Sequence, residues 1–245
     1  LEEAIPEFLT PYEYYPVIVE LTEEELEEYR ALSARLAKLA HSEDADEEIR
    51  ERIAQKRANV IKSAENKYQK LREVLSDIEQ VDHMLVYTNS GQLGEVQDIV
   101  NSEGLIQHKF TYRENSEERA RILRGFENGE YDALVAMKCL DEGVDVQATK
   151  QAILMSNTGN PMQFIQRRGR VLRRFPGKEK STIYDFVVVP SKHPDASIVS
   201  SERKILEKEL GRFEEFAESA DNERQARLKL GPMRIRYQIS EDGDD

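Results

Sequence analysis

Residues 81–190 of this chain predict an α/β fold with a doubly wound, mostly parallel sheet. Two observations carry the prediction. Short runs that are apolar at every position are typical of strands buried on both faces, and they alternate with segments whose apolar residues recur at helical spacing. Such alternation indicates repeated strand–helix–strand units. The flanking segments predict an N-terminal helical hairpin and a C-terminal helical tail.

The first 80 residues predict one short strand and two helices. Residues 17–21 fit a strand, and the Thr22 and Glu25 pair fits a capping box that opens a helix running to about Ala40. After a polar break, apolar residues at spacings of three, four and seven predict one longer helix over residues 47–80. We expect the two helices to pack as an antiparallel hairpin. Its basic face is either solvent-exposed or a contact for nucleic acid or a protein partner.

The central segment contains five apolar runs and three intervening helices. The first helix follows the first run and ends near Gly104, a residue suited to a helix C-terminal cap. The second opens at Ser116 and ends at Gly129. The third lies between the last two runs, with Pro161 near its first turn. The predicted strands cover residues 84–88, 108–112, 133–137, 152–156 and 183–189.

Residues 191–245 predict a helical extension. Residues 199–229 carry an apolar stripe at helical spacing, residues 234–240 fit an edge strand, and the chain ends in an acidic segment expected to be disordered. We therefore divide the chain into three parts. Residues 1–80 are a lead strand and helical hairpin that act as a linker or arm, residues 81–190 are the α/β domain, and the extension follows.

Composition limits the classes of ligand and compartment. The 245 residues carry a formal net charge of −13 at a pI near 5.0, so a nucleic-acid-binding surface would be a local basic stripe on an acidic body. Cys139 is the only cysteine, which excludes an internal disulfide and fits a reducing compartment. The four scattered histidines indicate no metal site. No apolar run approaches the length of a membrane span, so we expect a cytoplasmic protein.

A cluster of arginines stands near the end of the central segment. On a helix, Gln166, Arg170 and Arg173 would share one face, with Gln163 one turn earlier. A guanidinium grips phosphate oxygens in pairs, so two of them one turn apart in an acidic chain favour a polyphosphate ligand. The alternative is a solvent-exposed, arginine-rich helix. The arginines of the cluster are Arg167, Arg168, Arg170, Arg173 and Arg174.

Two stretches resemble a known family. CLDEGVDV (139–146) and QFIQRRGRVLRR (163–174) resemble motifs V and VI of superfamily 2 DEAD/DEAH-type helicases, nearest to the branch of nucleotide-excision-repair helicases and restriction-enzyme motors. The resemblance implies that residues 81–190 are a second RecA-like domain. It also implies that the chain is the C-terminal motor domain of an ATP-dependent DNA helicase or translocase. The alternative is a non-catalytic nucleic-acid-binding or scaffold module that keeps the helicase fold.

The resemblance assigns roles to residues of both motifs. Arg170 and Arg173 match the catalytic arginine fingers, which stabilise the charge that develops during phosphoryl transfer. Positions that support ATP binding are matched by Gln163, Gln166, Arg167 and Asp145.

The nucleic-acid track is expected at the carboxyl ends of the strands, where ligands of open α/β sheets collect. The LDEGVD loop, the arginine helix, and Asn89 with Ser90 each follow a predicted strand, so all are expected at that edge. Gly143 would let the backbone approach a phosphate closely. Many members of the resembled family have a threonine at the position of Met137, where it would contact a phosphate of the nucleic acid. Met137 cannot make that contact, and Lys138 would replace it. We expect DNA to bind there, although the motifs do not separate DNA from RNA.

Two motifs that ATP hydrolysis requires are missing from this sequence. It contains neither a G-x-x-x-x-G-K-[ST] loop nor a DEAD-like acidic box that would bind Mg²⁺. ATP with Mg²⁺ is therefore expected to bind between this chain and a preceding RecA-like domain, which would supply the phosphate cradle and the Mg²⁺ ligands. On this interpretation the sequence is part of a longer chain, ligates no metal and hydrolyses no ATP by itself.

Overall fold

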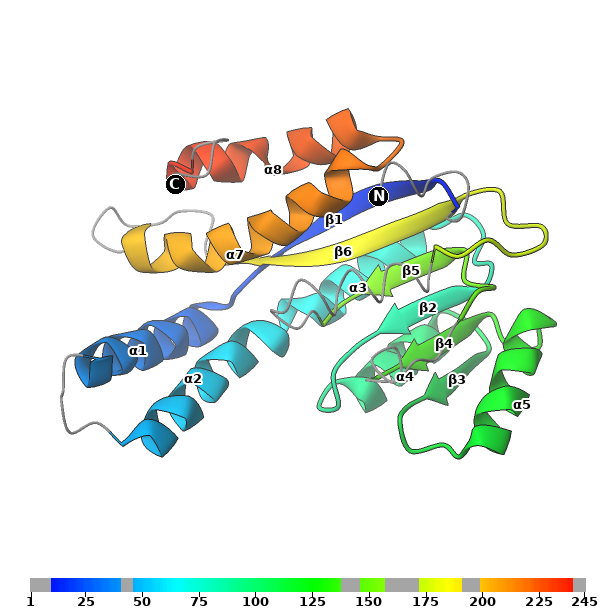
Figure 1. The fold of residues 1–245 in the computed structure, drawn as a ribbon, viewed down its shortest axis with the longest axis horizontal. Helices are drawn as coiled ribbons and strands as arrows, with labels where there is room; N and C mark the ends of the chain where they lie inside the picture. The colour runs from blue at the N-terminus through cyan, green and yellow to red at the C-terminus, as the bar shows by residue number, and fades with distance from the viewer. Residues whose placement is uncertain (1–9, 41–45, 138–145, 157–171, 191–198, 240–245) are drawn as a thin grey trace.

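The computed structural model describes residues 10–40, 46–137, 146–156, 172–190 and 199–239. Within them, six strands form one sheet in the order β1-β6-β5-β2-β4-β3, and every neighbouring pair is parallel (Figure 1). This confirms the predicted α/β fold. The strands are β1 (Tyr12–Glu20), β2 (Met84–Tyr87), β3 (Gln107–Phe110), β4 (Ala133–Ala136), β5 (Gln151–Leu154) and β6 (Ser181–Val189). The helices are α1 (Glu23–Ala40), α2 (Glu47–Lys62), α3 (Asn66–Asp77), α4 (Leu93–Ser102), α5 (Ser116–Glu127), α7 (Val199–Glu218) and α8 (Glu223–Tyr237).

Helices cover both faces of the sheet, as the apolar strands require. β2 and β4 are buried at every residue. One core joins the sheet to α5, α7 and α8 through side chains such as Phe126 and Phe213. The other core joins it to α3, α4 and the start of α1 through side chains such as Leu71 and Ile99. Because both faces are covered, only the two edge strands and the strand ends are open to ligands.

The strand expected at residues 17–21 is longer and belongs to the central sheet. β1 pairs with β6 over its whole length of nine residues. Its outer edge is closed by the Asn222 side chain, which accepts a hydrogen bond from Tyr14 N at 2.8 Å and donates one to Tyr14 O at 3.0 Å. Pro16 offers no N–H on the same strand, so this edge is poorly suited to pairing with another strand. The domain boundary at residue 80 stays a prediction.

The single long helix expected over residues 47–80 is wrong, because the structure has two helices with a break at residues 63–65. The break is held by hydrogen bonds from side chains at the start of α3. The side chain of Asn66 donates to Glu20 O at 2.8 Å, and the buried Lys67 ammonium donates to Lys62 O at 2.8 Å. The bend lets α3 pack on the sheet while α2 leaves it. Helical periodicity continues through the break, so the sequence pattern did not reveal it.

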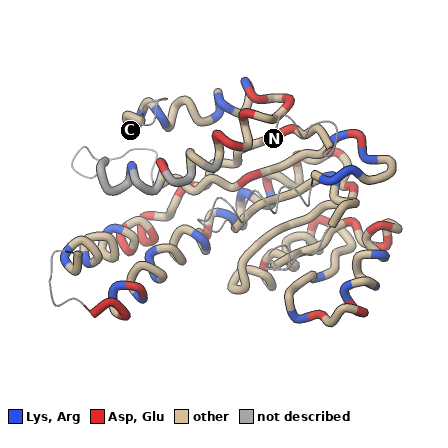
Figure 2. Tube along the Cα trace, in the orientation of Figure 1, with Lys and Arg blue, Asp and Glu red and all other residues tan. Residues whose placement is uncertain are grey.

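The predicted helical hairpin is present, formed by α1 and α2, which lie side by side beyond the carboxyl ends of the strands (Figure 1). The capping box at the start of α1 is confirmed, since Thr22 N donates to Glu25 and Glu25 N donates to Thr22 Oγ1. The guanidinium of Arg57 lies 5.7 Å from the ring centre of Tyr29. Acidic and basic residues mix along the hairpin (Figure 2).

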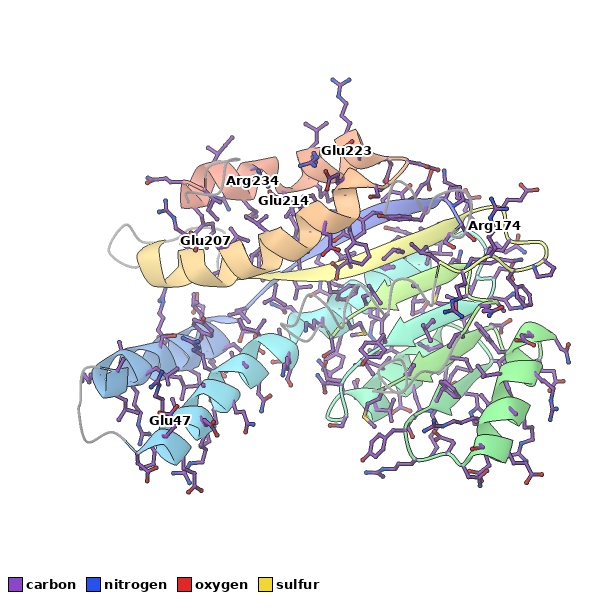
Figure 3. All side chains as sticks on the ribbon, in the orientation of Figure 1. Glu47, Arg174, Glu207, Glu214, Glu223 and Arg234 are labelled. Carbon is purple, nitrogen blue, oxygen red and sulfur yellow. The ribbon has the colours of Figure 1, made fainter. Side chains whose placement is uncertain are left out.

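The edge strand expected at residues 234–240 is wrong, because residues 234–237 form the last turn of α8. Tyr237 is fully buried, and the Arg203 side chain donates to its carbonyl at 3.0 Å. Arg234 forms an ion pair with Glu214 of α7 (Figure 3). These contacts bind the segment to α7 instead of to a strand. The predicted disordered end, residues 240–245, lies outside the described residues.

Candidate functional site

The carboxyl ends of β2, β4 and β3 lie side by side at one edge of the sheet. The register places Phe110 beside Ala136, and Ala136 beside Tyr87. One residue further along, Met137 N donates to Phe110 O at 3.0 Å and Thr88 N donates to Ala136 O at 2.9 Å. Three chain segments therefore leave the sheet side by side. The predicted nucleic-acid-binding residues Lys138 and Gly143, and the predicted ATP-binding Asp145, follow β4 but lie outside the described residues.

Asn89 organises the loop after β2. Its amide oxygen accepts hydrogen bonds from Gly91 N at 2.8 Å and Gln92 N at 3.0 Å, at the start of α4. Its amide nitrogen donates to Lys62 O at 3.0 Å and to Gln92 Oε1 at 2.7 Å. The amide that was predicted to bind nucleic acid thus joins this loop to the break after α2. Ser90 is exposed beside it, and both assignments to nucleic acid stay predictions.

Two buried polar side chains lie next to this loop, and the sequence pattern did not single them out. Lys67 is 2% exposed, and its ammonium shares the Lys62 carbonyl with Asn89. Thr88, at the end of β2, is 1% exposed, and its hydroxyl has no hydrogen-bond partner within the described residues. A buried ammonium beneath the loop adds positive charge at an edge predicted to meet phosphate.

Arg173 lies at the opposite edge of the sheet. Thr10, two residues before β1, donates its hydroxyl to Arg173 O at 3.3 Å, and Lys178, three residues before β6, donates to the same oxygen at 3.2 Å. The neighbouring Arg174 is seen at the start of β6 in Figure 3. The expectation that the arginines share the carboxyl edge is therefore wrong for Arg173. Since β5 and β6 are parallel, the connection between them must return the chain to the amino edge.

The surroundings of Arg173 fit an anionic ligand. Its side chain is exposed, and it lies outside any helix of the described residues, so the expected shared helical face does not extend to it. Its neighbour Arg174 lines a hollow of about 490 Å³. Thr10, Pro11, Arg174, Phe175, Pro176, Lys178 and Glu179 line the hollow. The other predicted ATP-facing residues, Gln163, Gln166, Arg167 and Arg170, lie outside the described residues.

Ion pairs connect neighbouring strands at the amino edge. Lys180 donates to Glu13 at 2.8 Å, and this hydrogen bond lowers the pKa of the Glu13 carboxyl. Burial raises the pKa of Asp82, but its contacts with Lys150 and His83 outweigh burial, so the net shift is downward. In the part of the chain that the structure describes, no group of three or more His, Cys, Asp or Glu side chains could hold a metal ion. No described helix has the length and apolar character of a membrane span.

Known proteins share this sequence pattern and fold. The family model of the helicase conserved C-terminal domain matches residues 66–175, starting at the first residue of α3. Over 193 residues the chain is 31% identical to the DNA 3′-5′ translocase XPB2 of Sulfurisphaera tokodaii, covering 71% of this chain and 43% of that protein. Over 183 residues it is 22% identical to the putative helicase 22 of a Sulfolobus islandicus filamentous virus, covering 74% and 31%. The chain spans less than half the length of either relative.

Among solved structures, the chain is similar to the C-terminal domain of the DEAD-box protein Dbp5, with a TM-score of 0.47 and 20% identity over 62% of this chain and 81% of that one.

The family match includes residues after β4 and residues up to Phe175, where the two motifs were recognised. Residues 66–175 are therefore the helicase conserved C-terminal domain of a superfamily 2 helicase.

Proposed function

We propose that the chain is the C-terminal motor domain of an ATP-dependent DNA helicase or translocase. The main support is the helicase C-terminal domain match, which includes Arg173, a residue with an exposed side chain at the amino edge. The relatedness to a DNA 3′-5′ translocase favours DNA over RNA as the partner. ATP hydrolysis requires a phosphate-binding loop and an acidic box that this sequence lacks. In this proposal a preceding RecA-like domain of a longer protein supplies both.

The amino edge is the proposed ATP-facing surface. ATP would supply the free energy for movement, and its phosphate cradle and Mg²⁺ ligands would come from the preceding domain. Arg170 and Arg173 would place guanidinium groups against the terminal phosphate and stabilise the charge that develops there. The exposed side chain of Arg173 fits that role. Gln163, Gln166, Arg167 and Asp145 are the proposed supporting residues.

The carboxyl edge is the proposed nucleic-acid track. The carboxyl ends of β2, β4 and β3 lie side by side, so a nucleic-acid strand crossing them could contact residues that follow several of these strands. Ser90, Lys138 and Gly143 would bind mainly the phosphate backbone, which carries no sequence information. Asn89 would hold its loop in shape. Contacts of this kind suit a motor that must act on many sequences.

The test is DNA-stimulated ATP hydrolysis by the full-length protein, with Arg170→Ala and Arg173→Ala compared with wild type. Loss of an arginine finger should lower kcat about 10³-fold or more while DNA affinity stays within about twofold. Arg121→Ala, an exposed arginine on α5, is the matched control and should keep full activity. Residues 1–245 alone should hydrolyse no ATP.

Three outcomes would contradict the proposal. An Arg173→Ala protein with unchanged kcat would remove this arginine from the ATP site. A full-length protein that binds DNA without any ATP hydrolysis would favour the scaffold alternative. Hydrolysis by residues 1–245 alone would mean that a complete nucleotide site exists within this chain.

A further inference from the structure

The loop between β3 and α5 presents an aromatic ring and a guanidinium together on the surface. The Tyr112 residue is 41% exposed, and the Cζ atom of Arg113 lies 5.7 Å from the centre of its ring. Both residues follow the carboxyl end of β3. Figure 1 shows this loop on the side of the sheet where the strand arrows end, the same side as the loop carrying Ser90.

Hydrogen bonds within the loop fix its shape. The Glu114 carboxylate accepts from Thr111 N at 2.7 Å and from the Thr111 hydroxyl at 2.9 Å. Arg113 N donates to Thr111 Oγ1 at 3.1 Å, and Arg119 of α5 donates to Tyr112 O at 2.9 Å. The backbone that carries the ring is therefore fixed before any ligand binds, which lowers the entropy cost of contact.

Two arginines lie close to the ring in an acidic chain. Arg113 follows Tyr112 directly, and Arg119 donates to the Tyr112 carbonyl, in a protein of net charge −13. The Glu114 carboxylate is bound to Thr111, and the Glu118 carboxylate accepts from a backbone N–H in the capping box of α5. An exposed ring with adjacent arginines suits a polyanion that also offers flat aromatic groups.

We propose that Tyr112 and Arg113 form a stacking platform for a base of single-stranded nucleic acid crossing the carboxyl edge. This rests on the proposed function and adds base contact to a track otherwise argued from backbone contacts. β3 is two strands away from β2, so the platform lies about 10 Å along the carboxyl edge from the loop of Ser90. A neighbouring base could stack there while the backbone follows the loops, because every base has an aromatic face. The guanidinium adds a cation–π contact and a phosphate contact.

The test measures binding of fluorescent single-stranded DNA to the full-length protein without nucleotide. Two strands of equal length are compared, oligo-dT and a strand whose central residues are abasic. Tyr112→Ala should weaken binding of oligo-dT about tenfold and binding of the abasic strand less than about twofold. Tyr112→Phe keeps the ring and should bind both strands like wild type. Arg113→Ala should weaken both strands and reduce the slope of log affinity against log salt by about one.

Two exposed residues serve as matched controls. Ile106→Ala removes an apolar side chain that is 62% exposed before β3, at the amino edge, and Arg124→Ala removes an exposed arginine from the last turn of α5. Neither should change binding of either strand by more than about twofold, since neither lies at the carboxyl edge. Thermal unfolding of each variant shows whether a loss of binding reflects a loss of folded protein.

Several results would overturn the platform. Unchanged binding of oligo-dT by Tyr112→Ala removes the ring from the track, and equal losses on both strands show that the residue supports the backbone contact or the loop instead of a base. In either case wild-type binding and the ATPase result for Arg173 leave the proposed function standing. If the wild-type protein binds no nucleic acid at all, the track and the platform both fail.

Discussion

Removal of the Asn89 side chain tests whether the loop after β2 depends on the break that follows α2. In Asn89→Ala, Gly91 N and Gln92 N lose their shared acceptor, and Gln92 Oε1 loses its donor at 2.7 Å. Lys62 O also loses one donor but keeps the ammonium of Lys67 at 2.8 Å. The substitution therefore leaves the N–H groups of Gly91 and Gln92 without this acceptor, while the Lys62 carbonyl keeps one donor.

The expected loss of stability follows from these contacts. Losing the acceptor at the start of a helix costs about 1 kcal/mol, and each of the two lost side-chain donations costs about 1 kcal/mol. Asn89 is half-buried, so water can replace part of this, and we expect a net loss of about 2 kcal/mol. For a chain of this size that loss lowers the Tm by about 4–8 °C.

Urea unfolding followed by circular dichroism measures the effect on the free energy of unfolding. Ser90→Ala is the matched control: Ser90 is the exposed neighbour on the same loop, and its loss should change stability by less than about 0.5 kcal/mol. A loss below about 0.5 kcal/mol in Asn89→Ala would refute the reasoning, because the four contacts would then have no energetic role in solution. A loss of DNA affinity at full stability would instead support the direct contact expected from the sequence.

Two further predictions concern packing and pH. Gly125→Ala should lower the free energy of unfolding by about 1–2 kcal/mol, because the added Cβ would lie 2.8 Å from a ring carbon of Tyr131. At Gly211 in α7 the added Cβ would meet nothing within 4 Å, so Gly211→Ala should raise the free energy of unfolding by about 0.5–1 kcal/mol. Urea unfolding checks both, and a stabilised Gly125→Ala would contradict the packing. Since Lys180 lowers the folded-state pKa of Glu13, the stability from this pair is present above the ordinary pKa of 4.5 and is lost as pH falls through the lower folded value. Glu13→Gln should be less stable than wild type by under about 1 kcal/mol at neutral pH, and the difference should shrink as the pH falls below 4.5; a difference that does not change with pH would contradict the pairing.

The sheet was predictable because its strands are buried on both faces. Runs such as residues 84–87 and 133–136 are apolar at every position, and helical segments separate them. The ends of two helices were also predictable from their glycines, since Gly104 and Gly129 adopt the positive φ that is common at a helix C-terminal cap. These features depend on local sequence alone, so no knowledge of distant contacts was needed.

The break after α2 was not predictable in the same way. Its cause is tertiary, since Asn66 and Lys67 bind carbonyl groups, one of which belongs to β1. No glycine or proline marks residues 63–65, and the apolar spacing remains helical across them. The C-terminal turn of α8 was misassigned for a related reason, because Tyr237 is buried in a core built from distant segments and its carbonyl accepts a hydrogen bond from Arg203 of α7. The spacing of apolar residues along the chain does not show a helix break or a helix end that tertiary contacts determine.

The position of Arg173 alters the expected geometry of the motor. Sequence order alone placed the arginines and the nucleic-acid loops at one edge, but a parallel crossover separates Arg173 from the loop of Asn89 by the length of the sheet. A four-residue strand spans about 13 Å, so in the proposed function ATP and nucleic acid would contact opposite ends of the same strands. The side chain of Arg173 could then not reach a ligand at the loop of Asn89. Coupling would have to come from movement of the whole sheet against the preceding domain, as in closure of two lobes around a nucleotide. The hairpin of α1 and α2 would move with the sheet, because β1 directly precedes α1 in the chain and pairs with β6.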